Sequence, residues 1–118
     1  MTLGEQQRKF TLMAARLISF AYASGFEMTF GECYRTPEQA ALNAKSGAGI
    51  SNSLHTLRLA IDLNLFKDGV YLADSAAHLP LGIYWESLGG SWGGRFRAAN
   101  GDPKPDGGHY SLSYGGVK

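Results

Sequence analysis

The sequence predicts an α+β fold, in which helices flank a small antiparallel sheet. Three observations favour this class. Residues 3–24 follow an amphipathic helical pattern, residues 58–65 alternate apolar and polar side chains, and a turn over 67–69 returns the chain as a hairpin. With 118 residues, the chain is long enough for one hydrophobic core and too short for two. We therefore expect a single domain over residues 1–118.

The composition excludes several classes of protein. Hydrophobic residues make up 44% and charged residues 18%, which disfavours a disordered chain. Eleven Lys and Arg against ten Asp and Glu leave a formal charge of +1 without a run of like charge, so nucleic acid is not an expected partner. The single cysteine, Cys33, excludes an internal disulfide and a thiolate zinc cluster, and we interpret it as a small buried residue. No segment reaches the roughly 18 apolar residues that span a bilayer, so membrane insertion is not expected.

The first half of the chain predicts two helices with a strand between them. In residues 3–24, apolar side chains recur at spacings of three and four: Phe10, Met13, Ala14, Leu17 and Ala21. Gly25 ends this helix, and residues 26–30 alternate as a strand with one buried face does. Thr36 is a capping hydroxyl before Pro37, which begins a helix to about Lys45. Residues 46–49 are predicted to form a loop.

The second half contains the strongest strand pattern. Four apolar side chains point to one face: Leu59, Ile61, Leu63 and Leu65. Asp62 therefore lies on the face opposite the core. Residues 70–72 form the returning strand of the hairpin, and residues 80–88 read as a helix stopped by glycines. A loop rich in Gly, Pro, Asp and Asn over 93–108 is long enough to suggest a function, and a last strand is predicted over 109–114.

Three residues of metal-binding type lie at the edge or on the polar face of predicted strands: His55, Asp62 and His109. Two imidazoles and a carboxylate supply three ligands and leave a fourth position for water, which is the arrangement of a catalytic zinc site. His-x6-Asp is a weak pattern by itself. The alternative interpretation is that each histidine is an ordinary hydrogen-bonding residue.

An acid close to His109 favours the metal interpretation. Asp106 stands three residues before His109, and Gly107 and Gly108 allow the backbone between them to bend tightly. A hydrolytic metal site needs a base that takes a proton from water and passes it to the leaving amine. The alternative is that Asp106 is only a turn former, and Asp102 is the rival for the role of base.

Four motifs stand out along the chain: Tyr-Arg-Thr-Pro-Glu-Gln at 34–39, Ser-Leu-His followed by Ala-Ile-Asp-Leu within 53–63, Trp-Gly-Gly at 92–94 and Asp-Gly-Gly-His at 106–109. They resemble motifs of the M15 family of zinc peptidases. The family's counterparts are a Tyr-Arg-(Ser/Thr) motif followed by a Gln, a Ser-x-His-(six residues)-Asp core, a Trp-Gly-Gly loop and an acid-x-x-His pair. The four motifs occur in the family's order and extend over about two-thirds of the chain. The family includes D-Ala-D-Ala carboxypeptidases, vancomycin-resistance dipeptidases and L-alanyl-D-glutamate endolysins of bacteriophages.

The resemblance implies a fold of the hedgehog/D-Ala-D-Ala peptidase type and a role for each matching residue. It makes the zinc ligands His55, Asp62 and His109. It makes Asp106 the general acid/base and Arg35 the cation that binds a substrate carboxylate or the developing oxyanion, for which a guanidinium is suited. It implies substrate-binding roles for Ser53, Gln39 and Trp92. Alternatives remain for three residues: a surface ion pair for Arg35, a helix cap for Gln39 and a core position for Trp92.

The sequence also departs from the family pattern. Arg95 and Phe96 stand where many members have an acidic residue and an aromatic one, and the loop leading to Asp106 is long. These differences leave the choice of substrate open. His78 matches no motif and is expected to be structural or exposed.

The function implied by the resemblance is zinc-dependent hydrolysis of peptidoglycan stem peptides by a monomeric phage endolysin, which cuts between an L- and a D-residue. The alternatives are a D,D-carboxypeptidase or dipeptidase, and a non-catalytic phage structural or cell-wall-binding module. Arg16 interrupts the apolar stretch 10–23 and no clear cleavage site follows it, so no signal peptide is expected. The expected location is the cytoplasm of a bacterial host until lysis.

Overall fold

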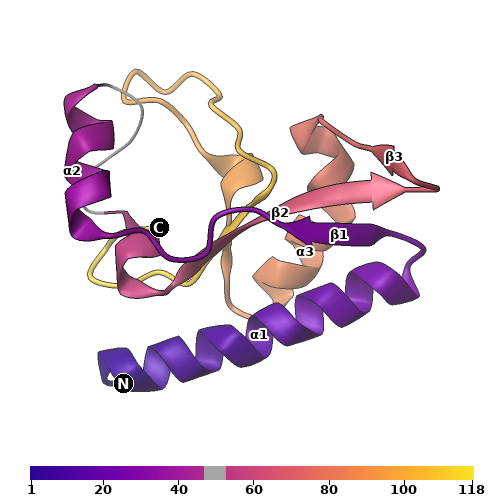
Figure 1. Cartoon of the computed structure of the whole chain (residues 1–118), viewed down its shortest axis with the longest axis horizontal. Coiled ribbons are helices and arrows are strands. Elements are labelled where there is room, and N and C mark those ends of the chain that lie inside the picture. Colours follow the sequence, from indigo (N-terminus) through magenta and orange to yellow (C-terminus); the bar gives the residue numbers. More distant parts are fainter. Residues whose placement is uncertain (47–52) are drawn as a thin grey trace.

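The computed structural model describes residues 1–46 and 53–118. The helices are α1 (Leu3–Ala23), α2 (Pro37–Lys45) and α3 (Leu79–Ser87), and the strands are β1 (Glu27–Phe30), β2 (Ala60–Lys67), β3 (Val70–Tyr71), β4 (Ser91–Trp92) and β5 (His109–Ser111). Three short 3₁₀ helices complete the fold: η1 (Leu54–Leu57), η2 (Ser75–His78) and η3 (Gly93–Arg95). The predicted α+β class with an antiparallel sheet is confirmed (Figure 1). Most of the predicted loop 46–49 lies outside the described residues.

Strand β2 organises the sheet. The strand order is β1-β2-β5-β4, β3 also pairs with β2, and all the pairings are antiparallel. The second half of β2 pairs with β1, whereas its first half pairs with β5, where Asp62 lies directly opposite His109. The hairpin turn between β2 and β3 places Asp68 and Gly69 at positive φ, as the sequence predicts for a tight turn. The register therefore brings together two residues that are 47 positions apart in the chain.

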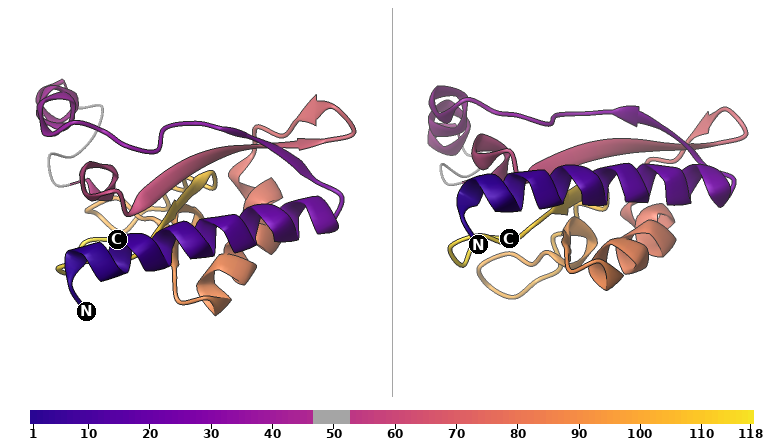
Figure 2. Two further views of the ribbon diagram at one scale, coloured as in Figure 1. Left: turned by 60° about the horizontal axis from the view of Figure 1, so that its bottom comes forward. Right: turned by 90° about the horizontal axis from the view of Figure 1, so that it is seen from below.

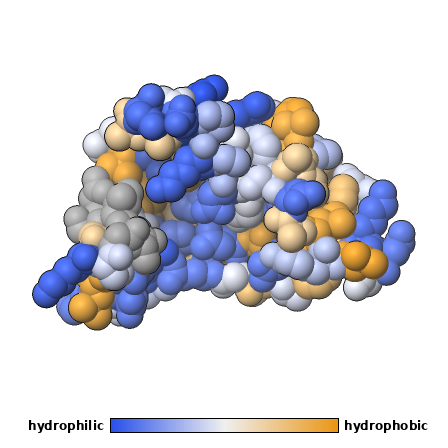
Figure 3. All heavy atoms as spheres, turned by 90° about the horizontal axis from the view of Figure 1, so that it is seen from above, coloured by the Kyte–Doolittle hydropathy of each residue, from blue (hydrophilic) through white to orange (hydrophobic). Residues whose placement is uncertain are grey.

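Helices α1 and α3 cover one face of the sheet, as both views of Figure 2 show. The side chain and backbone of Thr2 form a capping box with Glu5 at the start of α1, and the helix buries the apolar stripe predicted from its spacing. Trp85 of α3 is fully buried and packs edge-to-face against Phe10 and Tyr110. The opposite face of the molecule is different, because hydrophilic side chains gather across its middle (Figure 3). Apolar residues thus pack on one face of the sheet, and polar residues lie on the other.

Several details differ from the sequence prediction. The last strand ends at Ser111 rather than at residue 114, and the loop over 93–108 contains η3 and a bridge between Arg97 and Pro103. The two-residue strand β4 and the 3₁₀ helices have no periodic pattern and were not predicted. The interpretation of Cys33 as buried is wrong, since its thiol is exposed on the irregular segment that follows β1. Among the described helices, none combines the length and apolar character needed to cross a membrane.

Candidate metal centre

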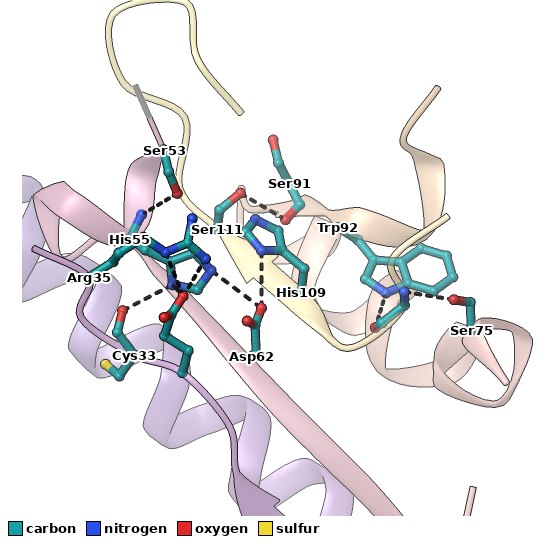
Figure 4. Close-up of polar contacts among 12 residues, drawn as sticks. Cys33, Arg35, Ser53, His55, Asp62, Ser75, Ser91, Trp92, His109 and Ser111 are labelled. Carbon is teal, nitrogen blue, oxygen red and sulfur yellow. Dashed lines mark hydrogen bonds and ion pairs between the residues drawn. The ribbon is translucent and has the colours of Figure 1, made fainter. Parts of the chain in front are cut away.

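The three residues predicted as metal ligands converge from three elements. His55 comes from η1, Asp62 from the polar face of β2, and His109 from the first position of β5. One ligand atom from each residue lies within 4.8 Å of the other two. The Asp62 Oδ1 atom is 3.4 Å from His55 Nε2 and 3.2 Å from His109 Nδ1, and Figure 4 shows both imidazoles directed at this carboxylate. The structure therefore assembles the predicted set on one site.

The geometry of this set fits zinc. Tetrahedral zinc with bonds of about 2.0–2.2 Å places neighbouring ligand atoms about 3.3–3.6 Å apart, close to the two distances measured to Asp62 Oδ1. Two imidazole nitrogens and one carboxylate oxygen are also ligand types that zinc accepts. Within the described chain, the buried Nε2 of His109 has no hydrogen-bond partner, so its ring makes its polar contact through Nδ1 alone. Three protein ligands leave a fourth position for water or substrate.

Two backbone contacts orient His55. The Ser53 hydroxyl accepts a hydrogen bond from the His55 backbone N–H at 3.2 Å and so fixes the start of η1. The Cys33 carbonyl lies 3.1 Å from His55 Nδ1, which makes Nδ1 a donor to the backbone and leaves Nε2 as the nitrogen that faces Asp62. Burial by itself lowers the pKa of His55, but hydrogen bonds to Asp62 and the Cys33 carbonyl outweigh burial and raise this pKa. The local fold therefore selects which nitrogen faces the site.

The Asp62 carboxylate is held ionised. Burial disfavours its charge, but the hydrogen bonds from His109 and His55 outweigh burial and hold the pKa of Asp62 well below its usual range. Its backbone is fixed as well, because its N–H donates to the Glu32 carbonyl and its carbonyl accepts from Gly31, both at 2.8 Å. An ionised, immobile carboxylate between two imidazoles is suited to binding a divalent cation.

Asp106 lies beside this set without belonging to it. Its backbone N–H donates to the Gly93 carbonyl at 2.9 Å, and its carbonyl accepts from the His109 N–H at 3.1 Å. Asp106 and Asp62 line the same cavity of about 240 Å³. Burial raises the pKa of Asp106, His109 and His55 oppose that rise, and the charge of Asp62 adds to it. A carboxyl with a raised pKa exchanges a proton more readily near neutral pH.

The rival acid, Asp102, lies elsewhere. It occupies the exposed end of the 97–103 loop, where its carboxylate accepts a hydrogen bond from Asn100 at 3.1 Å. Of the two acids of this loop, Asp106 is therefore the one that the fold brings to the centre.

Arg35 lies next to His55 in an ion pair with Glu32, a partner that the sequence analysis did not name. Its backbone N–H donates to the His55 carbonyl, and its guanidinium binds the Glu32 carboxylate, with Nε 2.8 Å from Oε1. The same Glu32 oxygen is 4.0 Å from His55 Nδ1. The Arg35 side chain is only 15% exposed, so this pair belongs to the site rather than to the open surface. The signal that was missed is an acid three residues before the motif arginine.

The three residues expected to contact substrate have other contacts. Ser53 is buried and caps η1, and Trp92 is 4% exposed in the core, where its Nε1 donates to the Gly107 carbonyl at 2.8 Å. Both side chains thus support the site from within the fold, and the substrate contacts expected of Ser53 and Trp92 stay predictions. Gln39 is exposed on α2. Its backbone N–H is capped by Thr36 and its side chain donates to Asn43.

Comparison with known proteins identifies the family. A family model described as D-alanyl-D-alanine carboxypeptidase matches residues 46–112, which is more than half of the chain and includes the three candidate ligands and Asp106. The chain belongs to the M15 family of zinc peptidases. The resemblance found in the motifs is thus confirmed, the chain is a metallopeptidase by family, and zinc is the cofactor for which this M15 site is built.

Two solved structures share the M15 fold with this chain. The L-Ala D-Glu endopeptidase ChiX of Serratia marcescens has a TM-score of 0.67 and 19% identity, and the match covers 93% of this chain and 85% of ChiX. The vancomycin-resistance D,D-pentapeptidase VanY of a VanB-type cassette, an E175A mutant in complex with Zn(II), has a TM-score of 0.57 and 20% identity. That match covers 88% of this chain and 70% of VanY. A comparison with curated protein sequences gives no match.

Proposed function

We propose that this M15 peptidase hydrolyses peptidoglycan stem peptides as a phage endolysin, cutting the bond between an L-residue and a D-residue. The observation that carries the proposal is the position of Asp106 beside the His55–Asp62–His109 set, in a cavity that it shares with Asp62. A purely structural metal site needs no acid next to an open coordination position. This arrangement supports a catalytic role rather than that of a wall-binding module.

The proposed mechanism assigns one task to each side chain. His55, Asp62 and His109 would hold zinc, which supplies a Lewis acid for the scissile carbonyl and lowers the pKa of water. The Asp106 carboxylate takes a proton from the attacking water. The same carboxyl then gives that proton to the nitrogen of the leaving amine, so the C–N bond breaks and the carboxylate is regenerated.

Cations around the centre support an anionic peptide as substrate. The Arg35 guanidinium binds Glu32 through Nε and Nη2, so Nη1, which has no partner among the described residues, can donate to a carboxylate of the substrate. A second cavity of about 450 Å³ has Asp106 on its wall together with three cations: Arg97, Lys104 and Lys118. Glutamate and terminal alanine supply carboxylates in stem peptides, so both regions are complementary to them.

The fold similarities support the endopeptidase over its closest rival. The likeness to ChiX, an L-Ala D-Glu endopeptidase, covers a larger share of both chains than the likeness to VanY, a D,D-pentapeptidase. The alternative is a D,D-carboxypeptidase or dipeptidase, which the description of the matching family model favours. Both reactions require the same metal set, the same acid and a cation for a carboxylate.

Digestion of purified muropeptides tests the proposal. The zinc-loaded protein is incubated with muropeptides, and the products are identified by mass spectrometry, with His55→Ala as the control that removes one ligand. We expect a fragment with a new D-glutamyl amino terminus, and no product from the control. Release of single D-alanine or of a D-Ala-D-Ala dipeptide would support the rival peptidase instead. Binding to peptidoglycan without any new amino group would support the non-catalytic module.

We further propose that the protein is a monomer that accumulates in the host cytoplasm until lysis. The support for this location is that residues 10–23 form part of α1 and pack into the core, so they serve the fold of the mature domain. Fractionation of expressing cells should find the chain with the cytoplasmic markers. Export of the intact chain in cells that lack a lysis protein would contradict this location, and a dimer in size-exclusion chromatography would contradict the monomer.

A further inference from the structure

The wall of the cavity beside the metal centre includes residues that belong to no family motif. Besides Asp62 and Asp106, it contains three residues from β3 and η2: Tyr71, Ser75 and His78. Figure 4 shows Ser75 on the opposite side of His109 from His55. The cavity of about 240 Å³ thus extends from the predicted catalytic acid to three side chains that have been given no role.

His78 and Tyr110 form a buried pair behind this wall. His78 is 5% exposed, Tyr110 is fully buried, and the Tyr110 hydroxyl lies 2.8 Å from His78 Nδ1. In the part of the chain that the structure describes, Nδ1 is the one hydrogen-bond partner of this hydroxyl. A buried phenol O–H needs an acceptor, so Tyr110 donates to Nδ1. A neutral imidazole that accepts at Nδ1 carries its proton on Nε2.

The protonated edge of His78 faces the cavity. A Cβ atom placed on Gly108, which lines the cavity, would lie 3.7 Å from His78 Cε1 and 3.9 Å from Nε2. Nε2 makes no hydrogen bond to any other described residue, although Nδ1 on the opposite side of the ring does. The pair therefore presents one N–H donor, which has no acceptor among the described residues, to the space beside the metal centre.

The neighbours of His78 add donors to the same wall. The Ser75 hydroxyl accepts a hydrogen bond from the Gly107 N–H at 2.9 Å, which leaves its own proton free to donate. Tyr71, which is 55% exposed, also lines the cavity, and its hydroxyl makes no hydrogen bond within the described residues. Since Asp62 and Asp106 line the same cavity, a carboxylate of the substrate would be repelled here. The complementary ligand is a neutral acceptor.

We propose that His78 contacts the substrate, its Nε2–H donating a hydrogen bond to an amide carbonyl oxygen of the peptide, and that Tyr110 is a positioning residue that fixes the His78 tautomer. The substrate class in this inference rests on the proposed peptidase function. Arg35 and the cations near Asp106 would bind the carboxylates of the peptide, whereas His78 would hydrogen-bond to its uncharged backbone.

The tautomer is tested without substrate or metal. Nitrogen-15 NMR of the imidazole nitrogens in the zinc-free protein distinguishes a protonated Nε2 from a protonated Nδ1. We expect His78 to be protonated at Nε2 in the wild type and to become a mixture of tautomers in Tyr110→Phe, which keeps the ring and removes the donor. A wild-type His78 protonated at Nδ1 would overturn the proposal, whatever the fate of the proposed function.

The substrate contact is tested with muropeptides. In the zinc-loaded enzyme, His78→Leu removes the donor and should raise KM by about 3- to 10-fold with little change in kcat, because one neutral hydrogen bond is lost. His78→Gln, which restores an N–H donor, should recover much of this loss, whereas a purely structural role predicts no such rescue. Circular dichroism confirms that both variants fold.

The two proposals fail in different ways. If His78→Leu cleaves muropeptides with the wild-type KM, the contact is wrong while the peptidase function stands. The second readout uses Asp106→Asn, whose lower kcat preserves the substrate during the measurement. Added muropeptide should shift the nitrogen-15 signal of His78 Nε2, and an unchanged signal at saturating muropeptide would overturn the contact even if the wild type cleaves nothing.

Discussion

Asp106 and Asp102 allow a direct test of which carboxyl is the general acid/base. Both belong to the same loop, but Asp106 lines the cavity beside the metal centre and Asp102 is exposed. We expect Asp106→Asn to lower kcat by about 10²- to 10⁴-fold, because the amide cannot take the proton from water. The zinc content should stay at the wild-type value, since Asp106 is outside the ligand set. Steady-state kinetics on muropeptides and metal analysis of the purified protein measure the two quantities.

The matched control is Asp102→Asn, which makes the same chemical change at the exposed end of the loop. It should keep nearly all of the activity. A similar loss of kcat in both variants would mean that the loop as a whole, rather than the Asp106 carboxyl, supports the reaction.

His78 makes the stability of the fold depend on pH. Burial lowers the pKa of His78 in the folded state, and its neighbours in the cavity and behind it are Asp62, Asp106 and Tyr110. Between this lowered pKa and the unfolded value of about 6.5, the unfolded chain binds more protons than the folded one. The stability contributed by neutral His78 is therefore complete above about pH 6.5 and is lost as the pH falls through the folded pKa.

Urea unfolding of the zinc-free wild type and His78→Gln between pH 5 and pH 8 measures this effect. The free energy of unfolding of the wild type, relative to the variant, should decrease as the pH falls below about 6.5. Other titrating groups are common to both proteins and cancel in the difference. A difference that stays constant with pH would show that His78 does not cause the acid sensitivity.

The elements that were predicted correctly are those whose signal is local. The helices α1, α2 and α3 follow from apolar spacing and caps, and β2 follows from alternation. In contrast, β4 has two residues and exists because it pairs with β5, so no pattern within it could reveal it.

At the site too, contacts between residues far apart in the chain could not be predicted. The candidate ligands were found through motifs, but the His78–Tyr110 pair joins residues 32 positions apart and leaves no spacing signal.

The tight contact of η3 with the loop before β5 explains why residue 93 is a glycine. A Cβ atom on Gly93 would lie 2.1 Å from the Asp106 carbonyl oxygen and 2.8 Å from His109 Cβ. We expect Gly93→Ala to push this loop away, which lowers zinc affinity and destabilises the fold by about 1–3 kcal/mol. Zinc titration and urea unfolding measure the two effects.

Gly4→Ala is the control for this substitution. Gly4 lies in the first turn of α1, where a Cβ atom would meet only the flexible end of Arg8 at 3.3 Å. This change should leave zinc affinity unaltered and keep or raise stability, because alanine favours a helix more than glycine does. Equal losses in both variants would rule out the steric explanation for Gly93.

Zinc should stabilise the whole domain, because its candidate ligands come from η1, β2 and β5. A ligand that binds only the folded state adds about 2.7 kcal/mol at a concentration one hundred times its Kd, which corresponds to a rise in Tm on the order of 10 °C for a domain of this size. Differential scanning fluorimetry with zinc and then a chelator measures the rise and its reversal. His55→Ala should show no rise, and an equal response in that variant would place the ion elsewhere.

The ladder between β2 and β5 also determines where the protein tolerates changes in chain length. Asp62 and His109 face each other because of strand register, and a shift of one residue would turn either side chain to the opposite face of the sheet. A single deletion within either strand should therefore abolish metal binding, whereas insertions at the exposed end of the 97–103 loop leave the Asp62–His109 spacing unchanged. Evolution of new substrate preferences, or their engineering, would accordingly act on loop length and sequence while the catalytic frame is inherited intact.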